Sequence, residues 1–219
     1  MNSWHGLDGY RGLRWTGTAV DRAGCRALRH LLAVRHEINA AAHGLRRRLQ
    51  AAPPPAEAYG ADQPFARELD LATRIVTARL PVVAIKVALG GFDTHANQAP
   101  THERLLGVLG DNLALLRRNL IAAGCWNDVV VATYSEFGRR ARQNASAGTD
   151  HGTAAPHFVM GGAVKGGLHG PAPALADLQD GDVRHAIDFR SLFAALARGC
   201  WGLPRDFGLR QPQRLDLIA

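Results

Sequence analysis

The chain has 219 residues, of which 47% are hydrophobic, so it can bury a core as one domain or as a large part of one. Its three cysteines lie far apart and in no C-x-x-C arrangement, which argues against a disulfide framework and a thiolate zinc site. The sequence shows no signal peptide and no run of roughly 18 apolar residues, so we expect a cytoplasmic protein that does not enter a membrane.

The formal net charge of +7 is concentrated near the N-terminus, where residues 1–50 hold nine arginines against three acidic residues. Such a basic segment attracts nucleic acid or an anionic membrane surface. However, aromatic residues for base stacking do not alternate with these arginines. We therefore interpret the segment as a solvated helix face or a protein docking surface. Nucleic-acid binding, which would weaken steeply with salt, is the less favoured alternative.

Helical patterns and a break organise the first part of the chain. Apolar residues recur at three- and four-residue steps over residues 22–50, which predicts an amphipathic helix. Three successive prolines within residues 51–64 then predict a linker or extended loop. A second helix should begin near Pro64 and end before Pro81. We expect a basic helical segment with its Pro-rich linker over residues 1–60 and a separate module over residues 61–219.

Two apolar runs, residues 81–89 (PVVAIKVAL) and 128–134 (DVVVATY), predict strands, and a helix is expected between them over residues 103–123. Strands that are apolar on both faces and joined by a helix are typical of a parallel sheet covered on each side. A third strand is expected near residues 157–160, and Asp188 should cap a final helix. We therefore expect an α/β fold, a three-layer αβα arrangement with a mostly parallel sheet.

Ligands of open parallel sheets bind beyond the carboxyl ends of the strands, where three polar clusters are expected. These clusters are Asp93 with His95, Glu136 with Arg139 and Arg140, and Asp150 with His151. Carboxylates and imidazoles suit zinc or manganese, and carboxylates also suit calcium. Each cluster alone equally fits a capping acid, a salt-bridged turn or a surface histidine. Their expected gathering at one edge of the sheet favours a divalent metal site.

Five ordered runs resemble the C-terminal half of domain-of-unknown-function family 1501, over about residues 60–219. They are GGFDTHANQ, VVVATYSEFGRR, N-x-S-x-GTDHGTA, HFVMGGAVKGGLHG and DFRSLFA. That family belongs with the alkaline-phosphatase-like superfamily, whose members use one or two divalent metals to hydrolyse or transfer phosphate or sulfate esters. The resemblance implies that Asp93 and His95 bind one metal, that Glu136 and His151 occupy further ligand positions, and that Asp150 is a weaker candidate. Arg139 and Arg140 would hold the anionic ester.

Two departures from the superfamily pattern leave two functions open. Ser135 and Glu136 stand where relatives of known activity usually carry Asp-His, and the early strand with its nucleophilic Ser or Thr has no counterpart, so the chain resembles a module without its N-terminal strands. One function is a metal-dependent hydrolase of small phosphate or sulfate esters. The other is a noncatalytic, partner-binding module with a structural metal or none. Unpaired sheet edges would favour self-association of the chain. Members of the family often carry an export leader, which this chain does not show.

Overall fold

The computed structural model describes residues 26–60 and 63–219. It divides into two compact units, Met1–Ala52 and Pro53–Ala219. The division falls within the predicted Pro-rich linker of residues 51–64, whereas the expected boundary lies further along that linker, at residue 60. In the described residues, no helix combines the length and the apolarity needed to cross a bilayer.

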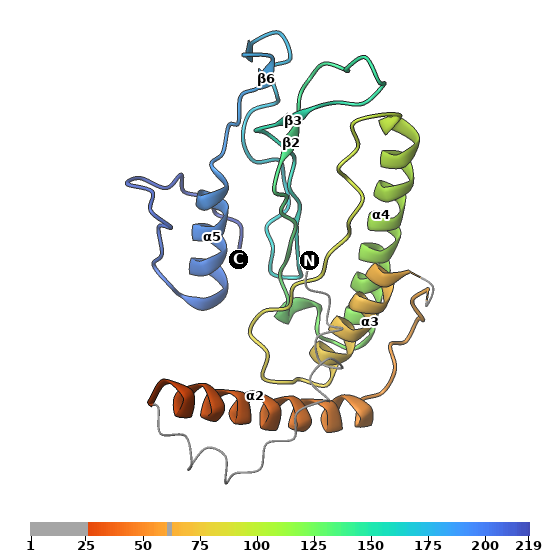
Figure 1. Cartoon of the computed structure of the whole chain (residues 1–219), viewed down its shortest axis with the longest axis vertical. Coiled ribbons are helices and arrows are strands. Elements are labelled where there is room, and N and C mark those ends of the chain that lie inside the picture. The colour runs from red at the N-terminus through yellow and green to blue at the C-terminus, as the bar shows by residue number, and fades with distance from the viewer. Residues whose placement is uncertain (1–25, 61–62) are drawn as a thin grey trace. The chain divides into compact units, whose positions relative to one another are not determined.

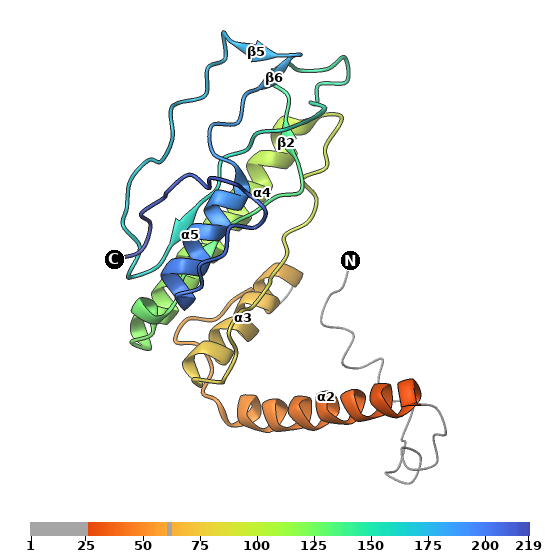
Figure 2. The same ribbon diagram turned by 90° about the vertical axis from the view of Figure 1, so that its left-hand side faces the viewer.

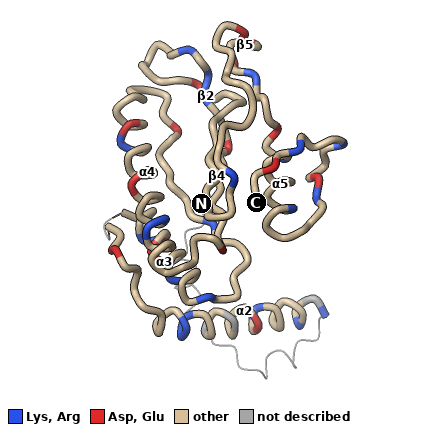
Figure 3. Tube along the Cα trace, turned by 180° about the vertical axis from the view of Figure 1, so that it is seen from behind, with Lys and Arg blue, Asp and Glu red and all other residues tan. Residues whose placement is uncertain are grey.

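The described part of the first unit is helix α2, Arg26–Ala51 (Figure 1). A helix is confirmed here, while the expected start at residue 22 lies outside the described residues. Figure 3 shows basic positions along α2, which carries six arginines and one acidic residue, Glu37. In the described residues, the basic excess of the N-terminal segment is thus carried by a helix, as predicted.

Helices α3, Pro64–Thr77, and α4, Gln98–Ala122, form the larger core of the second unit. Pro64 occupies the first turn of α3 as predicted, where its missing N–H leaves no intrahelical bond unmade. Leu69 of α3 packs in one buried cluster with Leu116 and Leu120 of α4. Burying each of these side chains contributes roughly 2 kcal/mol. α4 begins before its predicted start at residue 103, and a short 3-10 helix, η3 (Trp126–Asp128), follows it.

The expected three-layer αβα fold with a mostly parallel sheet is wrong. The described residues form three antiparallel pairs of two-residue strands and no extended parallel sheet. The pairs are β1 (Val131–Ala132) with β4 (Val159–Met160), β2 (Gly138–Arg139) with β3 (His151–Gly152), and β5 (Leu178–Gln179) with β6 (Asp182–Val183). The strands expected in residues 128–134 and 157–160 therefore exist in shortened form, but they run antiparallel to each other.

The apolar run at residues 81–89 shows why the expected parallel sheet does not form. The run is buried only in part, since Val87 and Leu89 pack against the α3–α4 core whereas Val83 is 77% exposed. Its backbone has no strand partner in the described part of the chain, and the Ala88 N–H donates instead to the Glu68 carboxylate at 2.9 Å. A hydrophobic pattern marks an apolar segment, but the burial of its side chains and its pairing as a strand depend on which other parts of the chain lie beside it.

Helix α5, Phe189–Trp201, lies across the strand segments from α4 (Figures 1 and 2). Leu192 and Ala195 of α5 pack with Leu217 and with Val159 of β4, whereas Val131 of β1 packs against the α3–α4 core. The β1–β4 pair thus connects the two hydrophobic clusters of the second unit.

Asp188 caps α5 as predicted, because its Oδ1 accepts the Arg190 N–H at 2.9 Å. The Arg190 guanidinium also donates to Asp188 Oδ2 at 2.7 Å. The side-chain hydrogen bonding of Arg190, and next its backbone N–H, lower the pKa of Asp188 from 3.8 to about 2. We expect Asp188→Ala to lower the free energy of unfolding by about 1 kcal/mol at pH 7.

Because the folded-state pKa of Asp188 is depressed, the charge-dependent part of its stabilisation is present above about pH 4 and is lost as the pH falls towards 2. The difference between wild type and Asp188→Ala in urea unfolding should therefore shrink over that range. The Asp188→Asn variant, which keeps the cap acceptor, should lose less stability at pH 7. Equal stability of wild type and Asp188→Ala at pH 7 would contradict the cap.

Candidate metal centre

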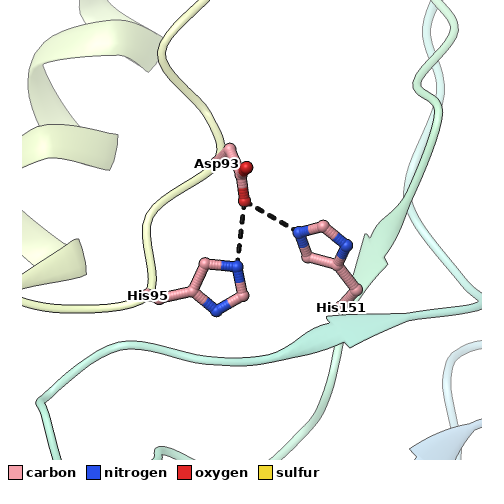
Figure 4. Close-up of side chains that lie close together, drawn as sticks. All are labelled: Asp93, His95 and His151. Carbon is pink, nitrogen blue, oxygen red and sulfur yellow. Dashed lines mark hydrogen bonds and ion pairs between the residues drawn. The ribbon is translucent and has the colours of Figure 1, made fainter.

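Two predicted ligands, His95 and His151, converge on a carboxylate oxygen of a third, Asp93 (Figure 4). His95 Nε2 lies 3.0 Å and His151 Nε2 lies 2.8 Å from Asp93 Oδ1. One ligand atom from each residue lies within 4.8 Å of the others. The side chains of Asp93, His95 and His151 are 63%, 52% and 46% exposed. The structure therefore assembles one carboxylate and two imidazoles at a surface that solvent reaches.

Two chain segments bring these side chains together. Asp93 and His95 lie just before α4, and His151 lies in β3. An antiparallel bridge joins Ala96 to Ala147, and the Asn97 N–H donates to the Ser146 carbonyl at 3.0 Å. The predicted gathering of Asp93, His95 and His151 is therefore found, although the rim of a parallel sheet, which was its expected cause, is not.

Asp93 is the charged partner of both imidazoles. The hydrogen bond from His151 lowers the pKa of Asp93 below its ordinary value of 3.8, and the charges of His151, His95 and Arg139 act in the same direction against partial desolvation. Asp93 is therefore ionised at neutral pH. An ionised carboxylate is the form that a metal ion binds.

Asp150 and Glu136 lie outside the group of three. Asp150 Oδ1 lies 3.6 Å from His95 Nδ1, on the imidazole nitrogen that does not face Asp93. The Asn144 side-chain amide donates to Asp150 Oδ1 at 3.3 Å and to the His95 carbonyl at 3.0 Å. Asp150 thus lies beside the outer nitrogen of His95, at a separation longer than a hydrogen bond. Glu136 is exposed. Among the described residues, it is not one of those whose ligand atoms lie within 4.8 Å of one another.

The comparison with protein families adds one finding. The family described as proteins of unknown function, DUF1501, matches residues 30–199. The chain belongs to the DUF1501 family. The chain matches no curated protein and no solved structure. The resemblance to DUF1501 that the sequence motifs indicated is thereby confirmed, and Asp93, His95 and His151 all lie within the matched residues.

The two arginines of this DUF1501 protein have different surroundings. The Arg139 guanidinium donates to the Thr149 carbonyl at 2.6 Å, to the Phe92 carbonyl and, at 3.4 Å, to the Thr94 hydroxyl. Arg140 is exposed, and its backbone N–H donates to the Asp150 carbonyl at 3.0 Å. That either arginine holds an anionic substrate remains a prediction.

Two residues near the candidate site were not among those predicted from the sequence. The Phe137 ring stacks on His151 with ring centroids 3.9 Å apart. Asn144 Oδ1 accepts the N–H groups of Ser146 and Gly148 at 2.9 and 3.0 Å. An Asn that precedes Ser and Gly at these spacings is a signal for such a turn, whereas no local pattern reveals the stacking of Phe137.

Gly148 allows the two ligand-bearing segments to approach each other. A Cβ at this position would lie 2.2 Å from the His95 backbone carbonyl carbon, so Gly148→Ala must displace one segment. We expect this variant to bind zinc about tenfold more weakly in competition with a chelator.

Gly107→Ala in α4 is the matched control for Gly148→Ala, since a Cβ at Gly107 would meet nothing within 4 Å. It should leave zinc affinity unchanged and raise stability by about 0.5–1 kcal/mol. Equal zinc affinities for the two glycine variants would show that the close approach does not matter for the site.

Proposed function

We propose that Asp93, His95 and His151 bind one divalent metal ion and that the protein is a metal-dependent hydrolase of phosphate or sulfate esters. The observation that carries the proposal is the convergence of two imidazole nitrogens on a single ionised carboxylate oxygen. Two histidines and one carboxylate are a donor set found in catalytic zinc sites, which keep an open coordination position.

The residues fit such an ion. Around a tetrahedral zinc with ligand distances of about 2.0 Å, neighbouring ligand atoms lie roughly 3.3 Å apart. The separations of 2.8 and 3.0 Å between the imidazole nitrogens and Asp93 Oδ1 need to widen by only a few tenths of an ångström. Two nitrogen ligands favour zinc or manganese over calcium, which prefers six to eight oxygens.

The open geometry favours catalysis over a purely structural metal. Structural zinc sites are closed by four protein ligands, whereas this group offers three exposed ones. A bound divalent ion would supply Lewis acidity towards an ester oxygen and favour ionisation of a water molecule. Arg140, which is exposed, is the proposed contact for the anionic phosphate or sulfate group.

Sequence kinship supports the choice of substrate class. The five motifs resemble the C-terminal half of the DUF1501 family, and we propose that this family belongs with the alkaline-phosphatase-like superfamily, whose members use divalent metals in phosphate or sulfate ester chemistry. We propose that the chain is related to that superfamily through these motifs and shares its substrate class.

The proposal is tested by equilibrium dialysis of the purified protein against zinc, manganese or calcium, followed by assays with an aryl phosphate and an aryl sulfate. We expect one equivalent of zinc or manganese and ester turnover that a chelator abolishes. The double variant Asp93→Ala/His151→Ala should bind no ion and should not turn over either ester. Stoichiometric metal without turnover would favour a noncatalytic module, and failure to bind either metal would overturn the proposal as a whole.

A further inference from the structure

We propose that Arg139 is a positioning residue that holds the Asp93–His95 segment against the His151 segment before any metal binds. The inference rests on the proposed metal site. It assigns Arg139 a role different from anion binding, because the contacts of its guanidinium group are with the protein itself.

Arg139 ties together the backbone on both sides of the ligand group. One guanidinium nitrogen donates to the Thr149 carbonyl at 2.6 Å, two residues before His151. The other donates to the carbonyl of Phe92, the residue before Asp93, and approaches the Thr94 hydroxyl between Asp93 and His95. The planar, forked guanidinium can bond several acceptors at once, which a lysine ammonium on a flexible stem does less rigidly.

The strand that carries Arg139 also positions His151 directly. Arg139 and His151 are paired in the β2–β3 register. Phe137, two residues before Arg139, stacks on the His151 ring at 3.9 Å with an interplanar angle of 4°. The Arg139 guanidinium carbon in turn lies 5.0 Å from the centre of the Phe137 ring. Phe137 thus contacts both Arg139 and His151, and its stacking limits the rotation of the His151 imidazole.

A second hydrogen bond joins the segments on the two sides of the site. The Thr149 hydroxyl donates to the Gln98 side-chain carbonyl at 2.8 Å, and Gln98 is the first residue of α4. Thr149 is therefore held to the α4 side of the site through its hydroxyl and to Arg139 through its carbonyl. Both sets of contacts involve protein groups alone, so the arrangement does not require a bound ion.

The test combines two measurements on the full chain, using the variants Arg139→Gln, Arg139→Lys and Phe137→Leu. Amide hydrogen exchange of the metal-free protein reports on residues 92–96 and 149–153, and chelator competition reports on zinc affinity. We expect Arg139→Gln to speed exchange in both segments about tenfold and to weaken zinc binding about 10–100-fold. Arg139→Lys should recover only part of the affinity, and Phe137→Leu should also weaken zinc binding.

Arg142→Gln is the matched control, since it removes the same charge from an exposed position on the loop between β2 and β3. It should match wild type in both measurements. Wild-type exchange in Arg139→Gln, or full recovery of zinc affinity by Arg139→Lys, would overturn the positioning role. Failure of wild type to bind either zinc or manganese would overturn the proposed function, while the exchange data would still decide the role of Arg139. Should Arg139→Gln also lose protection in α3 and α4, Phe137→Leu gives the decision, and wild-type zinc affinity in that variant would count against the proposal.

Discussion

Replacing His151 by alanine is expected to weaken zinc binding by roughly a hundredfold or more, because it removes one of three ligands where the loss of an outer-shell partner alone typically costs 10–100-fold. The side chain that is lost lies 2.8 Å from Asp93 Oδ1. Its removal should leave the fold intact, since His151 is exposed. Chelator competition measures the affinity, and circular dichroism checks the fold.

His169→Ala is the appropriate control for His151→Ala. His169 is also exposed and lies in the Gly-rich segment after β4, so the change removes an imidazole without touching the ligand group. It should bind zinc as wild type does. Similar weakening in both variants would mean that zinc binds histidines on the surface in general and not at Asp93, His95 and His151.

Leu120→Ala should produce the largest loss of stability, about 3–5 kcal/mol in urea unfolding. Leu120 is 1% exposed and lies in the cluster that joins α3 to α4. The substitution loses the transfer free energy of the side chain and leaves a cavity that close-packed neighbours fill only in part. The same cluster supports Val87 and Leu89, which precede Asp93, so the segment that carries Asp93 should become less stable as well.

Leu106→Ala on the same helix provides the comparison for Leu120→Ala. Leu106 is 54% exposed, and its truncation should change the free energy of unfolding by about 0.5 kcal/mol or less. If the two leucine variants were equally stable, the α3–α4 cluster would not be the main core of the second unit.

Helices could be predicted from the sequence because their signals are local. Pro64 marks the first turn of α3, and Asp188 caps α5 through a bond to a residue two positions away. Strand pairing depends on segments that are distant in the sequence, so the prediction of a mostly parallel sheet was wrong. Val131 and Val159 are apolar as expected of strands, yet nothing in the two runs shows that β1 and β4 pair antiparallel, with Val131 opposite Met160.

The candidate site could be predicted in part for the same reason. Asp93, His95 and His151 were suggested by residue type and by their places beside predicted strands, and these three converge. The contacts of Arg139 with Phe92 and Thr149 depend on how two loops approach each other. A sequence pattern marks a basic residue near acids and histidines, but it does not show whether its guanidinium group faces a substrate or the protein backbone.

X-ray absorption spectroscopy of the zinc-loaded protein tests the shared metal site most directly, because it identifies the atoms that surround the ion. We predict two imidazole nitrogens and at least one carboxylate oxygen at about 2.0–2.1 Å from zinc, with one imidazole fewer in His151→Ala. A first shell of oxygen atoms alone, or a spectrum that His151→Ala leaves unchanged, would contradict metal binding by Asp93, His95 and His151.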